Sequence, residues 1–236
     1  MLEGLKDWTY RRYWADETRP YQHLRDVLAE KVGAGTAVLD QGCGYRAPTL
    51  CELKGRGATL RGIDLVEFDN HDPDLDLHKG DLARTPYAEK EFDLVYSRSV
   101  MEHVVDPNAV YAETNRILKP GGRWLFLTAN RWDYVSLVAR AVPNRLHRRI
   151  VRTFEGRNEA DTFPTAYRTN DRKQIGGLAA RHGFQIRGFE YLSQYPSMFV
   201  GNGAAFLAAT AYEKLLMDIN ALRGLRGWLF VELEKS

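Results

Sequence analysis

The stretch Val38-Leu39-Asp40-Gln41-Gly42-Cys43-Gly44-Tyr45-Arg46-Ala47 decides the fold. It starts as a short apolar run, typical of a buried strand, and passes into a turn that contains two glycines. Gly42 and Gly44 permit a tight turn and allow a ligand to approach the backbone closely. A short helix is expected to follow over residues 47–55, so this stretch predicts a strand–loop–helix unit with a ligand at the loop. The plainer alternative is a glycine-rich turn that only connects a strand to a helix.

Apolar periodicity extends this unit in both directions. Amphipathic helices are expected where apolar residues recur every three or four positions, and strands where short apolar runs end at turn residues. A third, short strand is expected just before Asp81. The other expected strands are 36–40, 58–65, 92–97, 124–128, 184–192 and 228–234, and the expected helices are 20–32, 47–55, 107–118, 170–182 and 204–222. Strands that alternate with helices predict an α/β fold with a mostly parallel sheet.

Three acidic residues each follow one of the first three strands. Asp40 ends the first strand, Asp64 ends the second, and Asp81 comes directly after the third. Since the carboxyl ends of parallel strands lie along one edge of a sheet, these acids are expected to line one site. A single acid at such a position is more often a solvated loop residue, but three of them at successive strand ends favour a binding site.

The spacing Gly42-x-Gly44-x-x-Ala47, with Asp64 22 residues after Gly42, also satisfies the dinucleotide-binding fingerprint. Asp40 argues against a dinucleotide, because its charge would repel a pyrophosphate at the loop and attract an ammonium group. Asp64 is placed to accept hydrogen bonds from ribose hydroxyls, and Asp81 from an adenine amino group. A ligand with one ammonium group, one ribose and one adenine, and no phosphate, is S-adenosylmethionine.

Six segments carry a resemblance to a known family, in family order and at family spacing across about residues 36–130. They are Val38–Gly44, Gly62-Ile63-Asp64-Leu65, Gly80-Asp81-Leu82, Phe92-Asp93-Leu94-Val95-Tyr96-Ser97, Met101-Glu102-His103-Val104 and Leu118-Lys119-Pro120-Gly121-Gly122. In these segments the chain resembles the class I S-adenosylmethionine-dependent methyltransferases, in their small-molecule branch. The resemblance implies a Rossmann-like sheet of seven strands, with helices on both faces and the last strand antiparallel.

The resemblance also implies roles for individual residues. Gly42 and Gly44 would line the methionine portion of the cofactor, and Asp40 would hold its ammonium group. Asp64 with Leu65 would bind the ribose, Asp81 with Leu82 the adenine, and Ser97 would lie beside the cofactor. Arg98 would face the substrate pocket. Arg46 stands where the family often has a glycine.

His103 is the candidate general base, since an imidazole that titrates near neutral pH can take a proton from a hydroxyl or amine acceptor. A role at a helix start or a packing role is the alternative. Tyr13 and Trp14 are candidates to cover the sulfonium, whose positive charge suits an aromatic face. As core or lid residues they would need no such role.

Residues 130–168 interrupt the alternation of strands and helices and are expected to form a helical cap. Their composition combines Trp132 and other apolar residues with a run of arginines; Arg140, Arg145, Arg148, Arg149 and Arg152 are among them. Such a segment suits an anionic acceptor, an acidic membrane surface or simple shielding of the site. We expect a single domain, with an N-terminal helical segment (1–33), a cofactor-binding core (34–129), this cap, and the C-terminal part of the sheet (169–236).

Composition limits the partners. Lysine and arginine number 33 against 31 acids, a balance too even to favour nucleic acid. Two cysteines exclude a disulfide scaffold and an all-thiolate zinc site, and no metal is expected. No signal-like apolar region and no transmembrane segment are evident, so a cytoplasmic protein is expected. The apolar stripe of helix 204–222 suits either the core or a homodimer contact.

The sequence thus predicts transfer of a methyl group from S-adenosylmethionine to an oxygen or nitrogen of a small molecule, such as a sugar or natural product, leaving S-adenosylhomocysteine. A cofactor-binding partner protein without catalysis stays open, as does, with less support, an NAD-dependent oxidoreductase.

Overall fold

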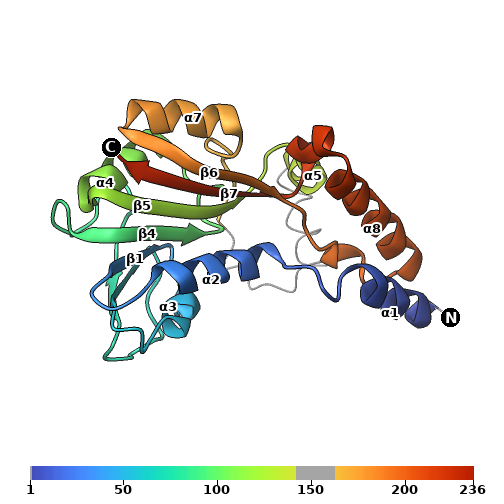
Figure 1. Ribbon diagram of the computed structural model, residues 1–236, viewed down its shortest axis with the longest axis horizontal. Helices are drawn as coiled ribbons and strands as arrows, with labels where there is room; N and C mark the ends of the chain where they lie inside the picture. Colours follow the sequence, from blue (N-terminus) through green and yellow to red (C-terminus); the bar gives the residue numbers. More distant parts are fainter. Residues whose placement is uncertain (1, 142–162) are drawn as a thin grey trace. The chain divides into compact units, whose positions relative to one another are not determined.

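The computed structural model describes residues 2–141 and 163–236. Its elements are α1 (Leu2–Tyr13), α2 (Pro20–Lys31), β1 (Ala37–Gln41), α3 (Pro48–Glu52), β2 (Thr59–Asp64), β3 (Asp76–Lys79), β4 (Phe92–Arg98), α4 (Pro107–Ile117), β5 (Leu118–Ala129), α5 (Tyr134–Ala141), α7 (Arg172–Arg181), β6 (Phe184–Leu192), α8 (Gly203–Asp218) and β7 (Trp228–Lys235), with 3₁₀ turns η2 (Ser197–Phe199) and η3 (Asn220–Leu225). Figure 1 shows them in chain colours.

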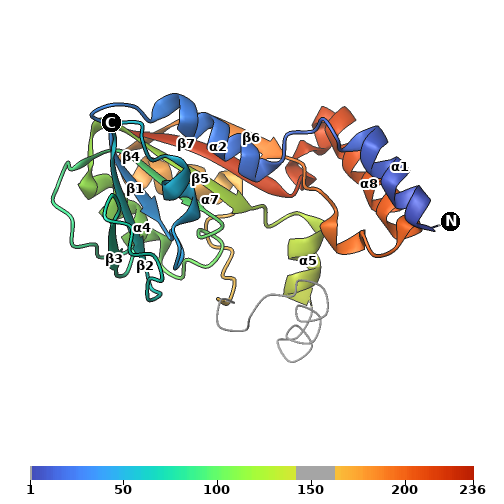
Figure 2. The same ribbon diagram turned by 90° about the horizontal axis from the view of Figure 1, so that it is seen from below.

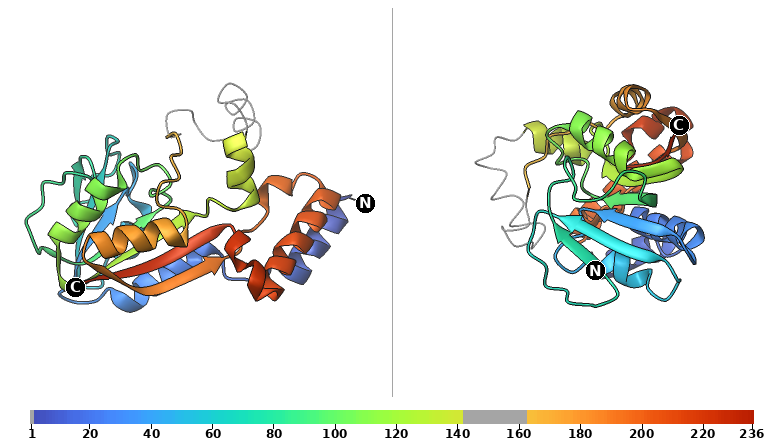
Figure 3. Two further views of the ribbon diagram at one scale, coloured as in Figure 1. Left: turned by 90° about the horizontal axis from the view of Figure 1, so that it is seen from above. Right: turned by 90° about the vertical axis from the view of Figure 1, so that its left-hand side faces the viewer.

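The seven strands form one sheet in the order β3-β2-β1-β4-β5-β7-β6. The pairs β2–β3, β1–β2, β1–β4 and β4–β5 are parallel. The last strand, β7, runs opposite to β6 beside it (Figure 1). Helices α2 and α3 cover one face and α4 and α7 the other (Figures 1 and 3). The predicted fold class is therefore confirmed, including the antiparallel last strand.

The core of the sheet lies at β4 and β5, whose side chains are buried on both faces, as expected of a covered parallel sheet. Trp124 of β5 is fully buried and meets the ring of Tyr111 from α4 at 4.7 Å between centroids. Phe184, at the start of β6, contacts the same indole at 5.6 Å. These aromatic contacts hold α4 and the edge strand β6 against the centre of the sheet.

Two predicted boundaries are wrong. Strand β5 begins at Leu118, directly after α4, rather than at Trp124. Phe92 pairs with Leu118 and Leu94 with Arg123, so the chain from Lys119 to Gly122 bulges out of the ladder between two paired segments. The second error is helix 204–222: α8 ends at Asp218, because Ile219 has an extended backbone, and the chain continues as η3.

The chain divides into two compact units. One comprises Met1–Pro20, Asn130–Pro164 and Tyr191–Trp228, and the other comprises Tyr21–Ala129, Thr165–Glu190 and Leu229–Ser236. The second, here called the sheet unit, contains all seven strands except the ends of β6 and β7. The first, here called the helical unit, contains α1 and α8, which pack side by side (Figure 2). The predicted single domain and its boundaries stay a prediction.

Of the predicted cap, residues 142–162 lie outside the described residues, and four of the five arginines named above fall there. Among its described residues, Tyr134–Ala141 form α5, and the buried Asp133 directly before this helix accepts hydrogen bonds from the backbone N–H groups of Val135 and Ser136. This acidic side chain satisfies N–H groups of the first helical turn.

Candidate functional site

The carboxyl end of β1 marks the point where the order of the sheet changes direction, with β2 on one side and β4 on the other. Ligands of open α/β sheets bind at such a switch point. Gly42 has a φ of +79°, and a Cβ built there would lie 2.2 Å from Cγ2 of Val100, which follows β4. The loops after β1 and β4 thus approach so closely that only glycine fits.

Gly44 differs from Gly42 in its surroundings. Its φ is +70°, but a Cβ built there would meet no atom within 4 Å. Its backbone therefore requires a residue that tolerates positive φ, while the space beside it is open. Open space over a glycine backbone allows a ligand to approach closely, and the predicted role of Gly44 stays a prediction.

Asp64, at the end of β2, contacts this loop directly. Its Oδ2 accepts the backbone N–H of Gly44 at 2.7 Å, and its Oδ1 accepts that of Val66 at 3.3 Å. A carboxylate has about four acceptor positions, so two further hydrogen bonds can still form. Asp64 is thus positioned by the loop and keeps acceptor capacity for a pair of hydroxyl groups.

Asp40 is buried at 3% exposure, and its Oδ2 accepts a 2.9 Å hydrogen bond from the hydroxyl of Tyr96 on β4. Burial raises the pKa of Asp40 to about 7, an effect that the Tyr96 hydrogen bond and the charge of Arg98 reduce and the charge of Asp64 increases. A buried carboxyl held near its titration point is ionised readily when a cation comes beside it. This environment suits an ammonium group and disfavours a phosphate.

The end of β4 contributes Ser97 and Arg98. Ser97 is fully buried, and its Oγ has no hydrogen-bond partner among the residues described. The guanidinium of Arg98 lies 5.0 Å from the ring centroid of Tyr21, whose hydroxyl is 2.8 Å from Oγ of Ser99. An unpartnered buried hydroxyl at this edge of the sheet is consistent with a polar ligand beside it.

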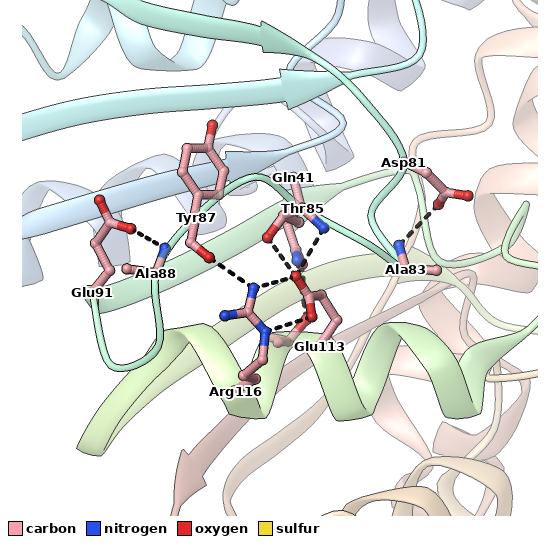
Figure 4. A network of polar contacts seen from close by, with 10 residues as sticks. Gln41, Asp81, Ala83, Thr85, Tyr87, Ala88, Glu91, Glu113 and Arg116 are labelled. Atoms are coloured by element: carbon pink, nitrogen blue, oxygen red, sulfur yellow. Dashed lines mark hydrogen bonds and ion pairs between the residues drawn. The ribbon is translucent and has the colours of Figure 1, made fainter.

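Asp81 and Leu82 lie in the loop after β3. Asp81 is exposed, and its Oδ1 accepts the N–H of Ala83 at 2.9 Å, which shapes a turn. Figure 4 shows how the chain beyond is anchored: Glu113 of α4 accepts both the N–H and the hydroxyl of Thr85, at 2.8 and 2.6 Å. Leu65, next to Asp64, is 55% exposed. Asp81, in the loop after β3, and Leu65, in the loop after β2, are therefore both exposed at the ends of their strands.

His103 is half-buried in the turn between β4 and α4, and its backbone N–H donates to the carbonyl of Val100 at 2.9 Å. The helix itself begins four residues later, at Pro107, with Asp106 capping it through the N–H of Ala109. His103 is therefore not at the start of α4, and its alternative role in packing stays a prediction. Its assignment as a base stays a prediction.

A buried polar chain beside His103 was missed by the sequence reasoning. Nδ2 of Asn170 donates to Oγ1 of Thr128 at 2.8 Å, and this hydroxyl donates to Oε2 of Glu102, also at 2.8 Å. The carbonyl of Glu102 accepts the N–H groups of Ala166 and Tyr167. These bonds tie the turn that carries His103 to the end of β5. Only the Glu-His pair signalled it in the sequence, because the partners lie far along the chain.

Tyr13, Trp14 and Trp132 belong to the helical unit, whereas the site residues described above belong to the sheet unit. Tyr13 ends α1 and meets Trp8 edge to face, at 5.9 Å between centroids. Trp14 is 4% exposed and donates from Nε1 to Oγ1 of Thr210 at 3.0 Å. Trp132 is 48% exposed, with Arg131 against its ring. Their predicted roles in substrate binding stay predictions.

Residues 39–126 match a family model described as a methyltransferase domain. This match identifies that part of the chain as a methyltransferase domain, and the sheet order agrees with the Rossmann-like fold of the class I S-adenosylmethionine-dependent methyltransferases. The match covers the core from β1 into β5, where the residues predicted to bind the cofactor lie.

The chain is 33% identical over 145 residues to the ubiquinone biosynthesis O-methyltransferase of Pseudomonas entomophila, covering 53% of this chain and 62% of that protein. It thus spans about three fifths of that relative. Among solved structures it resembles an S-adenosylmethionine-dependent methyltransferase of Mesorhizobium loti, with a TM-score of 0.63, 18% identity and coverage of 92% and 98%. A geranyl diphosphate C-methyltransferase of Streptomyces coelicolor has a TM-score of 0.58, 15% identity and coverage of 91% and 76%. These two likenesses concern the fold.

Within residues 2–141 and 163–236, no cluster of three or more His, Cys, Asp and Glu side chains has the arrangement of a metal site. The same residues contain no helix of the length and apolarity that a membrane span requires.

Proposed function

We propose that the protein binds S-adenosylmethionine at the carboxyl ends of β1, β2, β3 and β4 and transfers its methyl group to an oxygen or nitrogen of a small molecule. One observation carries the proposal. The N–H of Gly44 donates to Asp64 beside an open space at the switch point of the sheet. The contact holds the ribose-binding acid and the glycine backbone at one place.

The residues fit the parts of this cofactor in turn. The buried carboxyl of Asp40 is proposed to pair with the ammonium group, and Gly44 leaves room for the methionine chain. Asp64 keeps acceptor positions for the two ribose hydroxyls. Asp81, with Leu82, is proposed to meet the adenine, and Ser97 to supply its unpartnered hydroxyl beside the cofactor.

The bound sulfonium supplies an electrophilic methyl group with a good leaving group. The chain's own contribution is then mainly orientation, and holding the reacting atoms in line is worth up to roughly 7–11 kcal/mol. His103 is proposed to take the acceptor proton, which adds about 10²–10⁴-fold. The polar chain through Glu102 holds the turn that carries His103 in place.

An oxygen acceptor is favoured over nitrogen by the relatives named as ubiquinone biosynthesis O-methyltransferases. No nucleic-acid partner is proposed, because the charges of the chain are balanced.

The test is release of S-adenosylhomocysteine from S-adenosylmethionine with a panel of phenols, sugars, alcohols and amines. We expect turnover with an oxygen acceptor in the wild type, and a rate at least tenfold lower in Asp64→Ala at a limiting cofactor concentration. Cofactor binding without turnover on any acceptor would favour the non-catalytic alternative. Binding of NADH in place of the sulfur cofactors would favour the oxidoreductase.

A further inference from the structure

A cavity of about 250 Å³ lies within the helical unit. Its walls come from the segment after α1, from the end of β6 with the loop that follows, and from the chain after η3. The residues that matter for its chemistry are Trp14, Arg19, Tyr191, Ser193, Tyr195 and Arg226. The volume lies just below the roughly 300–1,000 Å³ of pockets for drug-sized ligands, and therefore suits a molecule with a single ring.

Two walls of the cavity are aromatic and fixed in place. Trp14 is held by its hydrogen bond to Thr210, and it meets Tyr195 edge to face at 5.4 Å between centroids. Tyr195 in turn contacts the buried ring of Phe206 at 5.5 Å. The cations of Lys214 and Arg19 lie over these rings, 5.4 Å from the centroid of Trp14 and 4.3 Å from that of Tyr195, so a flat ligand would pack against the ring surface that they leave open.

The charged groups of the cavity are predominantly positive. The guanidinium of Arg19 lies 4.3 Å from the ring centroid of Tyr195, and no described carboxylate forms an ion pair with it. Arg226 donates to the carbonyls of Tyr191, Leu216 and Met217 and forms no ion pair with a described carboxylate, and its charge also acts on the buried carboxyl of Glu213. The one carboxylate in the lining, that of Glu17, is paired with Lys214.

Ser193 adds a polar group. Its Oγ is buried and has no hydrogen-bond partner in the described part of the chain. A buried hydroxyl that makes no hydrogen bond is costly, and a ligand oxygen in the cavity would satisfy it. The guanidinium of Arg19 lies over the Tyr195 ring, and the N–H groups of an arginine can pair with both oxygens of a carboxylate.

We propose that this cavity binds a small aromatic carboxylate. Its ring packs against Trp14 and Tyr195, its carboxylate pairs with Arg19 near the charge of Arg226, and Ser193 hydrogen-bonds to one of its oxygens. All residues of this cavity belong to the helical unit, so benzoate binding there can be tested independently of cofactor binding in the sheet unit.

The test uses the full chain and two probes of nearly equal shape, benzoate and benzamide, measured by saturation-transfer NMR and calorimetry. We expect benzoate to bind at least tenfold more tightly than benzamide. Arg19→Gln should weaken benzoate binding at least fivefold, and Ser193→Ala should weaken it severalfold. Arg12→Gln is the matched control, because Arg12 is also exposed and stacked on a tyrosine of this unit but does not line the cavity.

Equal affinity for the two probes, or unchanged benzoate binding in Arg19→Gln, would overturn the proposal. A loss of benzoate binding in Arg12→Gln as large as in Arg19→Gln would do the same. Asp64→Ala should bind benzoate within twofold of wild type while it loses S-adenosylhomocysteine. Wild-type protein that binds benzoate but not S-adenosylhomocysteine would support the cavity and contradict only the proposed function.

Discussion

The backbone N–H of Gly44 donates a 2.7 Å hydrogen bond to Oδ2 of Asp64, and this contact joins the glycine loop after β1 to the end of β2. The two residues are 20 positions apart, and their strands are direct neighbours in the sheet. The bond fixes the carboxylate against the backbone of Gly44, next to which the ribose and methionine portions of the cofactor are proposed to bind.

Gly44→Ala should separate backbone strain from ligand contact. An alanine at positive φ costs about 1–2 kcal/mol in folding stability. Gly35 is a matched control, because its φ is +79° and it too has no atom within 4 Å of a built Cβ, but it lies at the amino end of β1. We expect similar losses of stability in both variants, measured by urea unfolding, and cofactor affinity at least tenfold weaker in Gly44→Ala alone. Equal affinity in the two variants would mean that no ligand occupies the space over Gly44.

Cofactor binding should release a proton from Asp40. Burial holds the pKa of this carboxyl at about 7 in the free protein, and a bound ammonium group would lower it. Affinity should therefore fall as the pH drops from 7 toward 5, by up to about tenfold per pH unit. Calorimetry at pH 7 in phosphate and in Tris should show an enthalpy difference that corresponds to release of roughly half a proton. Asp40→Asn should remove this difference, and a wild type without it would exclude Asp40 as the partner of the ammonium group.

His103→Ala should lower kcat by about 10²–10⁴-fold while cofactor affinity stays within a few-fold of wild type. His71→Ala is the control, since His71 is exposed in the loop between β2 and β3. A variant that keeps most of its kcat would show that the acceptor loses its proton elsewhere.

The free protein should be more stable at pH 5 than at pH 8. Burial raises the pKa of Glu213 to about 7 and that of Asp133 to about 6. The unfolded chain releases these protons near pH 4, so between pH 4 and 7 folding takes up protons, and stability falls as the pH rises. The raised pKa of Asp40 also makes stability fall as the pH rises over this range.

Glu213→Gln removes one of these buried carboxyls and should reduce the loss of stability between pH 5 and 8 by roughly 1–3 kcal/mol. Urea unfolding at pH 5 and at pH 8 measures this difference in the free energy of unfolding. Glu52→Gln, which affects a half-exposed side chain paired with Arg25, should leave the loss unchanged. If Glu213→Gln lost as much stability over this range as the wild type, Glu213 would already be ionised in the folded protein at pH 5.

The sequence predicted those parts of the fold that depend on local patterns. The loop Gly42-x-Gly44 follows a buried strand because the turn needs positive φ at both glycines, and this requirement is visible in the residue types. The bulge from Lys119 to Gly122 was not visible, since it arises from the register between β4 and β5. Proline and glycine there indicated only that a helix ends.

The partners of the candidate site were harder to predict than its members. Glu102 meets Thr128 across 26 positions of the chain, Thr128 in turn meets Asn170 across 42, and no short-range pattern encodes either contact. The hydrogen bond from Tyr96 to Asp40 spans 56 positions. Strand-end acids can be found from spacing because strands end at one edge, whereas the groups that set their pKa depend on packing.

The most direct test of the account is a calorimetric titration of S-adenosylmethionine and S-adenosylhomocysteine into the wild type, Asp64→Ala and Asp64→Asn. We predict micromolar affinity for the wild type. Asp64→Ala should bind at least about tenfold more weakly, since two ribose hydroxyls lose a charged partner at a cost of about 1.5–3 kcal/mol. Asp64→Asn, which keeps an acceptor for Gly44, should fall between the two. Unchanged affinity in Asp64→Ala would remove Asp64 from the site, and tight binding of NADH with neither sulfur cofactor bound would contradict the account as a whole.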